Sequence, residues 1–599
     1  MLFVRTHART RRFERLTART QPRETDQAMT LNPATDLLTR ARTWLAEDPD
    51  PDTRAELSAL LAAAECGDGT GSEDECRSWS RLSERFSGTL QFGTAGLRGE
   101  MGAGPMRMNR AVVIRAAAGL AAYVKRGGAH GLVVIGYDAR HKSYDFARDT
   151  AAVMVGAGLN AALLPGPLPT PVLAFAVRHL GAAAGVMVTA SHNPPRDNGY
   201  KVYLSGDLKG SQIVPPHDAG IAAEIDAVRS LNDVPLATDG WDVLAEAEIL
   251  EPYLSRAASV VDPHTPRDLS VVYTPLHGVG RDTLLSAFKR AGFPTPSTVT
   301  AQGDPDPDFP TVSFPNPEEP GAMDLAFRTA ASLGPDIVVA NDPDADRLAV
   351  AVPAHGTATG WRMLRGDEVG ALLATHLVSK RAEGTFATTI VSSSLLSRIA
   401  AAAGLPYAET LTGFKWISRA EGLRYGYEEA LGYCVDPEAV RDKDGISAAL
   451  SIAELAAGLK ESGRTLADLL DDLALTHGLH ATDQLSVRVA DLKLIGNAMA
   501  RLREQPPRAL AGLRVDSAED LEQGSADLPP TDGLRYRLSG DAVSSARVVV
   551  RPSGTEPKLK CYLEVVVPVA SGDVLNAARE RATALLESIK RDLSAAAGI

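Results

Sequence analysis

The chain has 599 residues, of which 44% are hydrophobic and 23% are charged, and its formal net charge at pH 7 is −13. At about 150 residues per domain this length predicts roughly four domains, and the composition is that of a globular protein with several buried cores. The acidic balance argues against general nucleic-acid binding, which needs a basic surface, but it permits local basic pockets for small anions.

The four cysteines lack the spacing of a disulfide framework or a zinc site. We therefore expect reduced thiols and a cytoplasmic location. No apolar run approaches the ~18 residues that a membrane-spanning helix needs, and no secretory signal is present, so no membrane partner is expected.

Residues 1–28 contain seven arginines and little apolar periodicity. This composition superficially resembles an organelle transit peptide, but Glu14, Glu24 and Asp26 count against that interpretation. We expect residues 1–35 to form a disordered leader, and Met29 is an alternative start.

Three helices are predicted next, at residues 36–45, 53–64 and 78–86, with a surface loop at 67–75. A short apolar strand, a polar loop and an amphipathic helix then recur, with strands at 132–135, 185–188, 269–273, 336–340 and 387–391. Strands that alternate with helices predict an α/β fold with mixed or parallel sheets. Ligands bind outside the carboxyl ends of such strands, which is where the polar loops lie.

The C-terminal segment differs from this pattern. From about residue 481 it contains two strand-like runs, at 545–551 and 558–567, and a closing helix at 573–595. These elements predict a smaller α+β domain. Residues 512–533 are rich in Ala, Gly and Asp and are predicted to form an inserted loop.

The stretch at residues 189–194, Thr-Ala-Ser-His-Asn-Pro, follows a buried strand. Its prolines force the backbone out of regular structure. A serine presented at the end of a buried strand beside a histidine, here Ser191 and His192, is a candidate covalent nucleophile. The tetrapeptide at 191–194, Ser-His-Asn-Pro, is by itself more typical of an ordinary polar turn, and only the rest of the chain favours the nucleophile.

Asp342, Asp344 and Asp346 alternate directly after a buried strand. Charges this close repel by about 1 kcal/mol per pair in water and by more at a lower dielectric, so a bound cation is expected. Oxygen ligands without His or Cys favour a hard cation such as Mg²⁺, although a solvated turn is the alternative. An EF-hand does not fit, because the loop lacks its glycine and its closing glutamate.

The run at residues 551–557, Arg-Pro-Ser-Gly-Thr-Glu-Pro, offers the donors that a phosphate needs. The glycine-rich stretch at 92–99 likewise presents an arginine, Arg98, from a flexible loop. Lys415 and Lys443 are each presented from a turn, where a lone lysine is usually just solvated. The adjacent Glu428 and Glu429 pair either accepts vicinal sugar hydroxyls or forms salt bridges.

A nucleophile, a hard-metal loop, a phosphate loop and a carboxylate pair are the components of a phosphoryl-transfer site on a polyol. Together with the glycine-rich stretch of Arg98 they make five motifs in chain order: the Arg98 stretch at 93–98, the serine loop at 189–194, the metal loop at 342–347, the carboxylate pair at 428–432 and the phosphate loop at 551–557. With these motifs the chain resembles the α-D-phosphohexomutases, the phosphoglucomutases and phosphomannomutases, from about residue 40 onward. The variants at 92–98, 274–280, 413–416 and 427–433 look most like the long subfamily of bacterial α-phosphoglucomutases and related phosphopentomutases.

The resemblance implies three similar α/β domains with mixed sheets and a smaller C-terminal α+β domain around a central cleft. The expected units are a leader at 1–35, domain I with the phosphoserine loop at 36–228, domain II with the metal loop at 229–352, domain III with the sugar-binding loop at 353–480, and domain IV with the phosphate-binding loop at 481–599. A hinge is expected near residue 480, because the reaction requires the last domain to move.

The resemblance also implies the chemistry. Ser191 would be carried as phosphoserine, and one Mg²⁺ would be held by the seryl phosphate with Asp342, Asp344 and Asp346. The phosphoryl group would pass to one end of a sugar monophosphate, and the resulting bisphosphate would turn over in the cleft. The phosphate at its other end would then return to Ser191.

The remaining motif positions take roles by the same resemblance. Three surround the transferred group: Arg98, His192 and Lys201. Lys443 is the candidate acid/base partner, and Glu428 is expected to hold the sugar hydroxyls. The residues expected to bind the phosphate that is not reacting are Arg551, Ser553, Gly554 and Thr555, with Lys415 assisting, and Arg347 is a further expected substrate-binding residue.

Two departures from the family pattern concern the choice of substrate. Ala430 stands where many relatives have a serine, and the loop at 204–210 is altered or lengthened. We expect a phosphoglucomutase that interconverts glucose 1- and 6-phosphates, activated by its intermediate glucose 1,6-bisphosphate, as a monomer or dimer. Phosphomannomutase and phosphopentomutase are the nearest alternatives, and a sugar-phosphate phosphatase or an inactive sugar-phosphate-binding paralogue is more remote.

Overall fold

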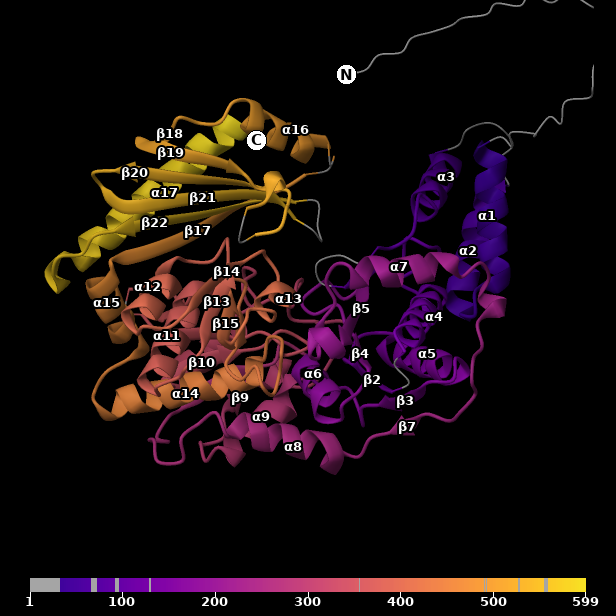
Figure 1. Cartoon of the computed structure of the whole chain (residues 1–599), viewed down its shortest axis with the longest axis horizontal. Coiled ribbons are helices and arrows are strands. Elements are labelled where there is room, and N and C mark those ends of the chain that lie inside the picture. The colour runs from indigo at the N-terminus through magenta and orange to yellow at the C-terminus, as the bar shows by residue number, and fades with distance from the viewer. Residues whose placement is uncertain are drawn as a thin grey trace, which may run out of the picture.

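The computed structural model describes residues 33–65, 73–91, 96–128, 131–354, 356–489, 491, 493–525, 528–553 and 558–599. Its strands form four sheets in succession along the chain, each packed against helices (Figure 1). We number these four units, each a sheet with its helices, as domains I to IV. Within the described ranges no helix is both long and apolar enough to cross a bilayer.

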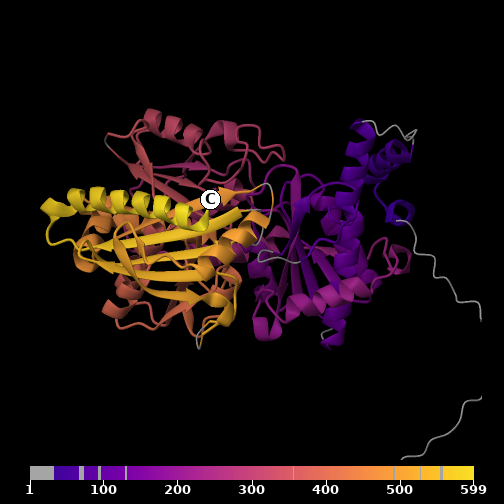
Figure 2. The same ribbon diagram turned by 90° about the horizontal axis from the view of Figure 1, so that it is seen from above.

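Three helices with a hydrophobic core of their own precede the first sheet: α1 (Pro33–Glu47), α2 (Pro51–Glu65) and α3 (Glu73–Arg85). They confirm the three predicted helices. However, α1 begins inside the expected leader, because Pro33 suits the first turn of a helix, and α3 begins inside the predicted loop 67–75. Residues 1–32 and 66–72 lie outside the described ranges. Figure 2 shows the three helices at one end of the molecule, beside domain I.

Domain I is a mixed sheet in the order β1-β5-β4-β2-β3-β7, with β6 beside β5. Strands β4, β2, β3 and β7 run parallel, and β5 is antiparallel to β1, β4 and β6. The strands are β1 (Leu97–Glu100), β2 (Leu132–Tyr137), β3 (Asn160–Leu163), β4 (Ala184–Val188), β5 (Asp197–Leu204), β6 (Ser211–Gln212) and β7 (Asp242–Val243). The helices are α4 (Arg110–Arg126), α5 (Ser143–Gly156), α6 (Thr170–His179) and α7 (His217–Ala227).

Domain II has the strand order β12-β11-β10-β8-β9. Its elements are β8 (Val271–Thr274), β9 (Ser297–Thr298), β10 (Ile337–Ala340), β11 (Ala349–Pro353), β12 (Trp361–Met363), α8 (Glu246–Ala258), α9 (Gly280–Arg290) and α10 (Asp324–Leu333). Two short strands differ from the expected domain boundaries. Strand β7 follows the boundary at 229 but pairs with β3 of domain I, and β12 follows the boundary at 353 but pairs with β11 of domain II. Both are two or three residues long, which is too short for a periodic signal.

Domain III has the strand order β14-β13-β15-β16. Its elements are β13 (Thr385–Thr389), β14 (Tyr407–Thr410), β15 (Leu423–Glu428), β16 (Gly432–Cys434), α11 (Gly366–Ser379), α12 (Leu395–Ala402), α13 (Phe414–Ile417), α14 (Gly445–Glu461) and α15 (Leu466–His477). Helix α14 packs against α8 and α9 as well as α11, so domains II and III share one hydrophobic core.

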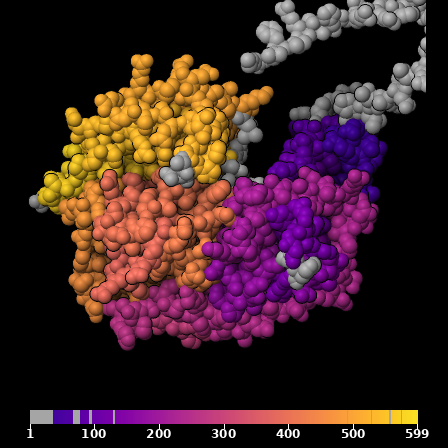
Figure 3. Space-filling model, viewed as in Figure 1, coloured from indigo at the N-terminus to yellow at the C-terminus, as the bar shows by residue number. Residues whose placement is uncertain are grey.

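Domain IV is an antiparallel sheet in the order β17-β22-β21-β20-β19-β18. Its elements are β17 (Leu479–Arg488), β18 (Ala509–Leu510), β19 (Leu513–Asp520), β20 (Leu534–Gly540), β21 (Val543–Pro552), β22 (Lys558–Val567), α16 (Lys493–Glu504) and α17 (Leu575–Ala597). The smaller α+β domain is confirmed. Figure 3 shows it above domain III, with a hollow between it and the three N-terminal helices.

The expected inserted loop at 512–533 is wrong in its first part. Residues 513–520 form β19, and a 3₁₀ turn follows at η4 (Leu521–Gln523). Only Leu513 is fully buried in this strand, which lies next to the short edge strand β18. The apolar alternation was therefore too weak to reveal a strand. The other 3₁₀ turns are η1 (Gly206–Leu208), η2 (Leu231–Asp233), η3 (Thr300–Gln302) and η5 (Gly572–Val574).

Candidate active site

A cavity of about 510 Å³ lies where the four domains meet. Its lining combines nucleophilic, acidic and basic side chains from all four domains, including Ser191 and Lys201 of domain I, Glu318 and Arg347 of domain II, Glu428 and Lys443 of domain III, and Arg551 and Ser553 of domain IV. The motifs that are far apart in the sequence thus converge on one space.

Ser191 lies in a tight turn just after β4. Its backbone has a φ of 53°, in the left-handed region, and the residue is only 2% exposed. The Ser191 hydroxyl donates to Asp342 Oδ2 at 2.7 Å, and its oxygen lies 3.2 Å from His192 Nδ1. The serine of domain I is therefore in direct contact with the aspartate loop of domain II.

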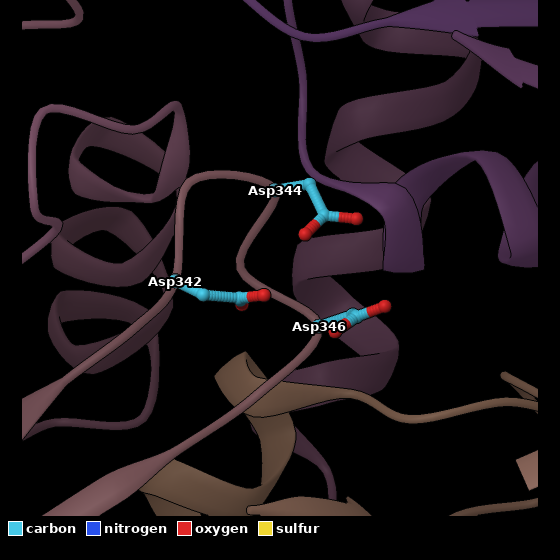
Figure 4. Close-up of side chains that lie close together, drawn as sticks. All are labelled: Asp342, Asp344 and Asp346. Atoms are coloured by element: carbon cyan, nitrogen blue, oxygen red, sulfur yellow. The ribbon is translucent and has the colours of Figure 1, made fainter. Parts of the chain in front are cut away.

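The aspartate loop follows β10, and a positive φ at Ala345 shapes its turn. Figure 4 shows the side chains of Asp342, Asp344 and Asp346 projecting from this one loop. All three residues are fully buried, and one oxygen from each lies within 4.8 Å of the others. Oδ1 of Asp344 and Oδ1 of Asp346 are buried without a hydrogen-bond partner. An oxygen-only donor set with unused buried acceptors fits Mg²⁺.

Lys201 offsets part of this negative charge. Its ammonium, on β5, lies 2.6 Å from Asp344 Oδ2 and 2.9 Å from Asp346 Oδ2. Burial raises the pKa of Asp342, and the charges of Asp344 and Asp346 raise it further. Burial acts in the same direction on Asp346, but the positive charges beside it, Lys201 first, outweigh this and hold its pKa well below the usual value.

Lys443 reaches the same loop from domain III, with its ammonium 3.3 Å from Asp346 Oδ2. The neighbouring Asp442 is held by two donors of domain I, Tyr203 Oη and Gln212 Nε2, each at 2.7 Å. Burial acts to lower the pKa of Lys443, but the surrounding carboxylates, Asp346 first, outweigh it and raise the pKa. Lys443 is therefore positively charged at neutral pH.

The two adjacent glutamates have different surroundings. Glu428 Oε1 lies 3.9 Å from the ammonium of Lys443, and burial raises the pKa of this carboxyl despite that charge. Glu429 Oε2 accepts hydrogen bonds from the hydroxyls of Thr389 and Ser392, at 3.1 and 3.0 Å. Ala430 also lines the cavity, where it presents no hydroxyl.

Arg98, His192 and Arg347 add positive and polar groups around the serine. Arg98 Nη1 donates to Asn193 Oδ1 at 3.3 Å, and Arg347 Nε lies 3.8 Å from Asp342 Oδ2. Removal from water, and then the charges of Arg347 and Arg98, hold the pKa of His192 well below its ordinary value. The imidazole is therefore neutral at pH 7.

The structure places only some of the predicted phosphate-binding residues. Arg551 and Ser553 line the cavity from domain IV, whereas Gly554 and Thr555 lie outside the described residues, as do residues 92–95. Lys415 is 8% exposed in α13 and is not a lining residue, and burial lowers its pKa. Its role at the phosphate site stays a prediction.

Several lining residues were not recognised from the sequence. Domain II contributes Phe314, Asn316 and Glu318, from a proline-rich segment that carries no catalytic signature. Domain IV contributes Lys558, Lys560 and Tyr562 of β22. Their alternation along one strand is a signal that could have identified them, because alternate strand residues share a face.

Family models match the chain in four segments. "Phosphoglucomutase/phosphomannomutase, alpha/beta/alpha domain I" matches residues 89–232, domain II of the same family matches 251–356, and domain III matches 365–476. The C-terminal domain of this family matches residues 532–578.

Individual proteins give the same result. A probable phosphomannomutase of Haemophilus influenzae is 48% identical over 464 residues, which are 77% of this chain and 93% of the relative. A probable phosphoribomutase of Schizosaccharomyces pombe is 36% identical over 594 residues, covering 92% of this chain and 96% of the relative. The crystal structure of a putative phosphomannomutase from Thermus thermophilus superposes with a TM-score of 0.64 at 27% identity, covering 84% of this chain and 99% of that one.

Proposed function

The chain belongs to the phosphoglucomutase/phosphomannomutase family and is a phosphomutase, an isomerase that moves phosphate within a sugar phosphate; we propose that it interconverts α-D-glucose 1-phosphate and glucose 6-phosphate. The reaction would proceed through a phosphoserine at Ser191 and a glucose 1,6-bisphosphate intermediate. The observation that carries this proposal is the 2.7 Å contact between the Ser191 hydroxyl and Asp342, inside a cavity that all four domains line.

The charge layout of the cavity supports a bisphosphorylated sugar. Arg98 and Lys201 lie on the domain I side with Ser191, and Arg551 lies on domain IV, while the adjacent carboxylates Glu428 and Glu429 belong to domain III. A sugar bisphosphate likewise carries an anion at each end and hydroxyls between them. Cationic side chains bind phosphate, and carboxylates accept hydrogen bonds from hydroxyls.

Asp342, Asp344 and Asp346, with the seryl phosphate, are the residues that would hold Mg²⁺, which neutralises charge on the transferred phosphoryl group and acts on it as a Lewis acid. Lys201 lies at this loop already, 2.6 Å from Asp344. Arg98 and neutral His192 are proposed to orient the phosphoryl group.

We assign the donor of the proton that the transfer requires to domain III. When the phosphoryl group returns to Ser191, the Ser191 hydroxyl gives its proton to Asp342, which it contacts at 2.7 Å, the bond from phosphorus to the sugar oxygen breaks, and that oxygen takes up a proton. Lys443 is the proposed donor, because its raised pKa keeps it protonated at neutral pH. Glu428 is proposed to hold the sugar hydroxyls in both orientations of the intermediate.

The intermediate must turn over between two half-reactions, so we propose that domain IV moves about the short connection between α15 and β17. Gly478 lies in this connection with a φ of 87°, which side-chain-bearing residues rarely adopt. This position agrees with the hinge expected near residue 480.

Phosphomannomutase and phosphopentomutase activity are the alternatives within the family. Relatives named for mannose and for ribose cover most of the chain. In addition, Ala430 lines the cavity without a side-chain hydroxyl that could bind the sugar. A coupled assay with a trace of each sugar bisphosphate, over the 1-phosphates of glucose, mannose, ribose and deoxyribose, decides between them. The highest kcat/KM for glucose 1-phosphate supports the proposal, and a tenfold preference for another sugar overturns it.

The same assay tests the more remote alternatives. Release of inorganic phosphate without isomerisation identifies a phosphatase, and binding of sugar phosphate without turnover identifies an inactive paralogue. Turnover that stops with chelator and returns with Mg²⁺ is the result expected of the proposed site.

A further inference from the structure

The buried guanidinium of Arg140 binds the backbone of the turn that carries Ser191. Arg140 Nη2 donates to the carbonyl oxygens of Ser191 and Asn193, both at 2.6 Å. Arg140 Nη1 donates to the carbonyl oxygens of Pro194 and Asp197, at 2.8 and 3.1 Å. Arg140 itself is only 4% exposed, so a buried charge is devoted to four backbone carbonyls of a single loop.

The backbone amide of Ser191 is tied to the same segment. It donates to Thr189 Oγ1 at 2.8 Å, and that hydroxyl donates to Asp138 Oδ2 at 2.6 Å. Asp138 Oδ2 in turn lies 3.4 Å from Arg140 Nε. The Ser191 carbonyl is therefore bound by Arg140, and the Ser191 amide is bound by Thr189, which Asp138 holds in turn; these contacts explain how a serine keeps a left-handed φ of 53°.

An aromatic ring of domain II supports the guanidinium. Arg140 Cζ lies 4.9 Å from the ring centroid of Phe309, which is itself buried. Next to this contact, His141 Nε2 lies 2.8 Å from Asp308 Oδ1 across the same boundary. Domain II thus touches the serine turn at two places, with Asp342 at the hydroxyl and Phe309 behind the guanidinium.

We propose that Arg140, stacked on Phe309, is a positioning residue that sets the Ser191 oxygen relative to the aspartate loop. Arg140 does not line the cavity, so it acts through the serine turn and not on the substrate. The packing of domain II on domain I thereby fixes the geometry of phosphoryl transfer. This role rests on the proposed function, in which Ser191 carries the phosphoryl group.

Arginine is suited to this task because its planar guanidinium presents five donors in a fixed arrangement. A lysine at position 140 keeps the charge but cannot span four carbonyls. Arg140→Lys should therefore lower kcat about 100-fold, as expected for a small misplacement of a reacting atom, with KM unchanged within about threefold. Phe309→Leu should lower kcat about five- to tenfold by removing the cation–π contact, and Phe309→Tyr should retain activity.

Arg267 provides a matched control in domain II. Its guanidinium donates to the carbonyl oxygens of Asp262, Thr265, Pro266 and Ala291, and its Cζ lies 4.7 Å from the ring centroid of Phe293. Neither Arg267 nor these partners line the cavity. Arg267→Lys should lower the melting temperature but leave kcat within about threefold of the wild type.

The experiment measures kcat, KM and the ³¹P NMR signal of the phosphoserine in the full chain. A kcat loss confined to Arg140→Lys and Phe309→Leu, with a shifted ³¹P signal and recovery in Phe309→Tyr, supports the positioning role. Losses no larger than that of Arg267→Lys, or a change in KM alone, overturn it. If Arg140→Lys does not fold, the Phe309→Leu and Phe309→Tyr pair decides alone. Absence of turnover in the wild type on every sugar phosphate would instead refute the proposed function.

Discussion

Replacement of Lys201 by methionine tests the electrostatics of the aspartate loop most directly. The Lys201 side chain is 2% exposed, and its ammonium lies 2.6 Å from Asp344 Oδ2 and 2.9 Å from Asp346 Oδ2. Methionine has nearly the same length and is apolar, so the variant removes the charge while it leaves little empty space. Three buried carboxylates then face one another with one fewer compensating charge.

The expected cost follows from these contacts. Each hydrogen bond to a charged group contributes about 1.5–3 kcal/mol, and removing one partner of a buried ion pair costs about 3–5 kcal/mol. In chelator we therefore expect Lys201→Met to lose about 3–5 kcal/mol of unfolding free energy. For a domain of about 200 residues that unfolds as one unit, this loss is a fall in melting temperature on the order of 10 °C. If the same interaction is retained in the transition state, kcat/KM should fall by about 10²–10⁴.

Differential scanning fluorimetry over a Mg²⁺ titration is the assay. Mg²⁺ bound at the proposed site would offset the missing charge, so the melting temperature should rise more in Lys201→Met than in the wild type. Lys380→Met is the matched control, because the Lys380 ammonium lies 2.7 Å from Glu454 Oε2, away from the cavity. Its destabilisation should be independent of Mg²⁺, with kcat unchanged within about threefold. Equal Mg²⁺ dependence in the two variants would refute the reasoning.

Three further outcomes are expected. Ser191→Ala should reduce mutase turnover by at least about 10³-fold and abolish labelling of the protein by ³²P-labelled sugar bisphosphate; retained labelling would place the phosphoryl group elsewhere. Tyr203→Phe removes a 2.7 Å hydrogen bond to Asp442 and should lower kcat about tenfold by loosening Lys443, which steady-state kinetics would show; an unchanged kcat would contradict this coupling. Burial raises the pKa of Asp367 from 3.8 to about 6, so the folded protein binds this proton more tightly than the unfolded chain does. Stability should therefore fall by up to about 3 kcal/mol as pH rises from about 4 to 6, and urea unfolding of Asp367→Asn should lose this slope; an unchanged slope would assign it to another group.

The fold could be predicted from the sequence where strands are buried on both faces and helices are amphipathic. Strands β4 and β10 were located closely, because continuous apolar runs bounded by polar loops have few other interpretations. Strand β19 was missed because its residues are mostly polar and half exposed. The two-residue β7 carries no period at all, and only its pairing with β3 places it in domain I.

The candidate site could be predicted only where residues that are neighbours in the sequence form one functional loop. Ser191 and the three aspartates could be proposed from the sequence because a few neighbouring residues, after a buried strand, already indicate a nucleophile and a cation site, and the structure brings the serine and the aspartate loop into contact. The lining residue Phe314 and the Asp442 partner Tyr203 were not identified, because nothing beside them in the chain distinguishes them from ordinary core or loop residues.

By itself the sequence therefore determined the candidate reacting groups, their order and the class of reaction, since these depend on short motifs and on the strand ends that present them. Only the tertiary structure decided how the groups are held. Arg140 is stacked on Phe309, and Lys443 is placed beside Asp346 by an Asp442 that Tyr203 of another domain binds. The residues in each of these contacts lie about 100 to 240 positions apart, so no local pattern encodes them, and only the packing of separate domains around one cavity brings them together.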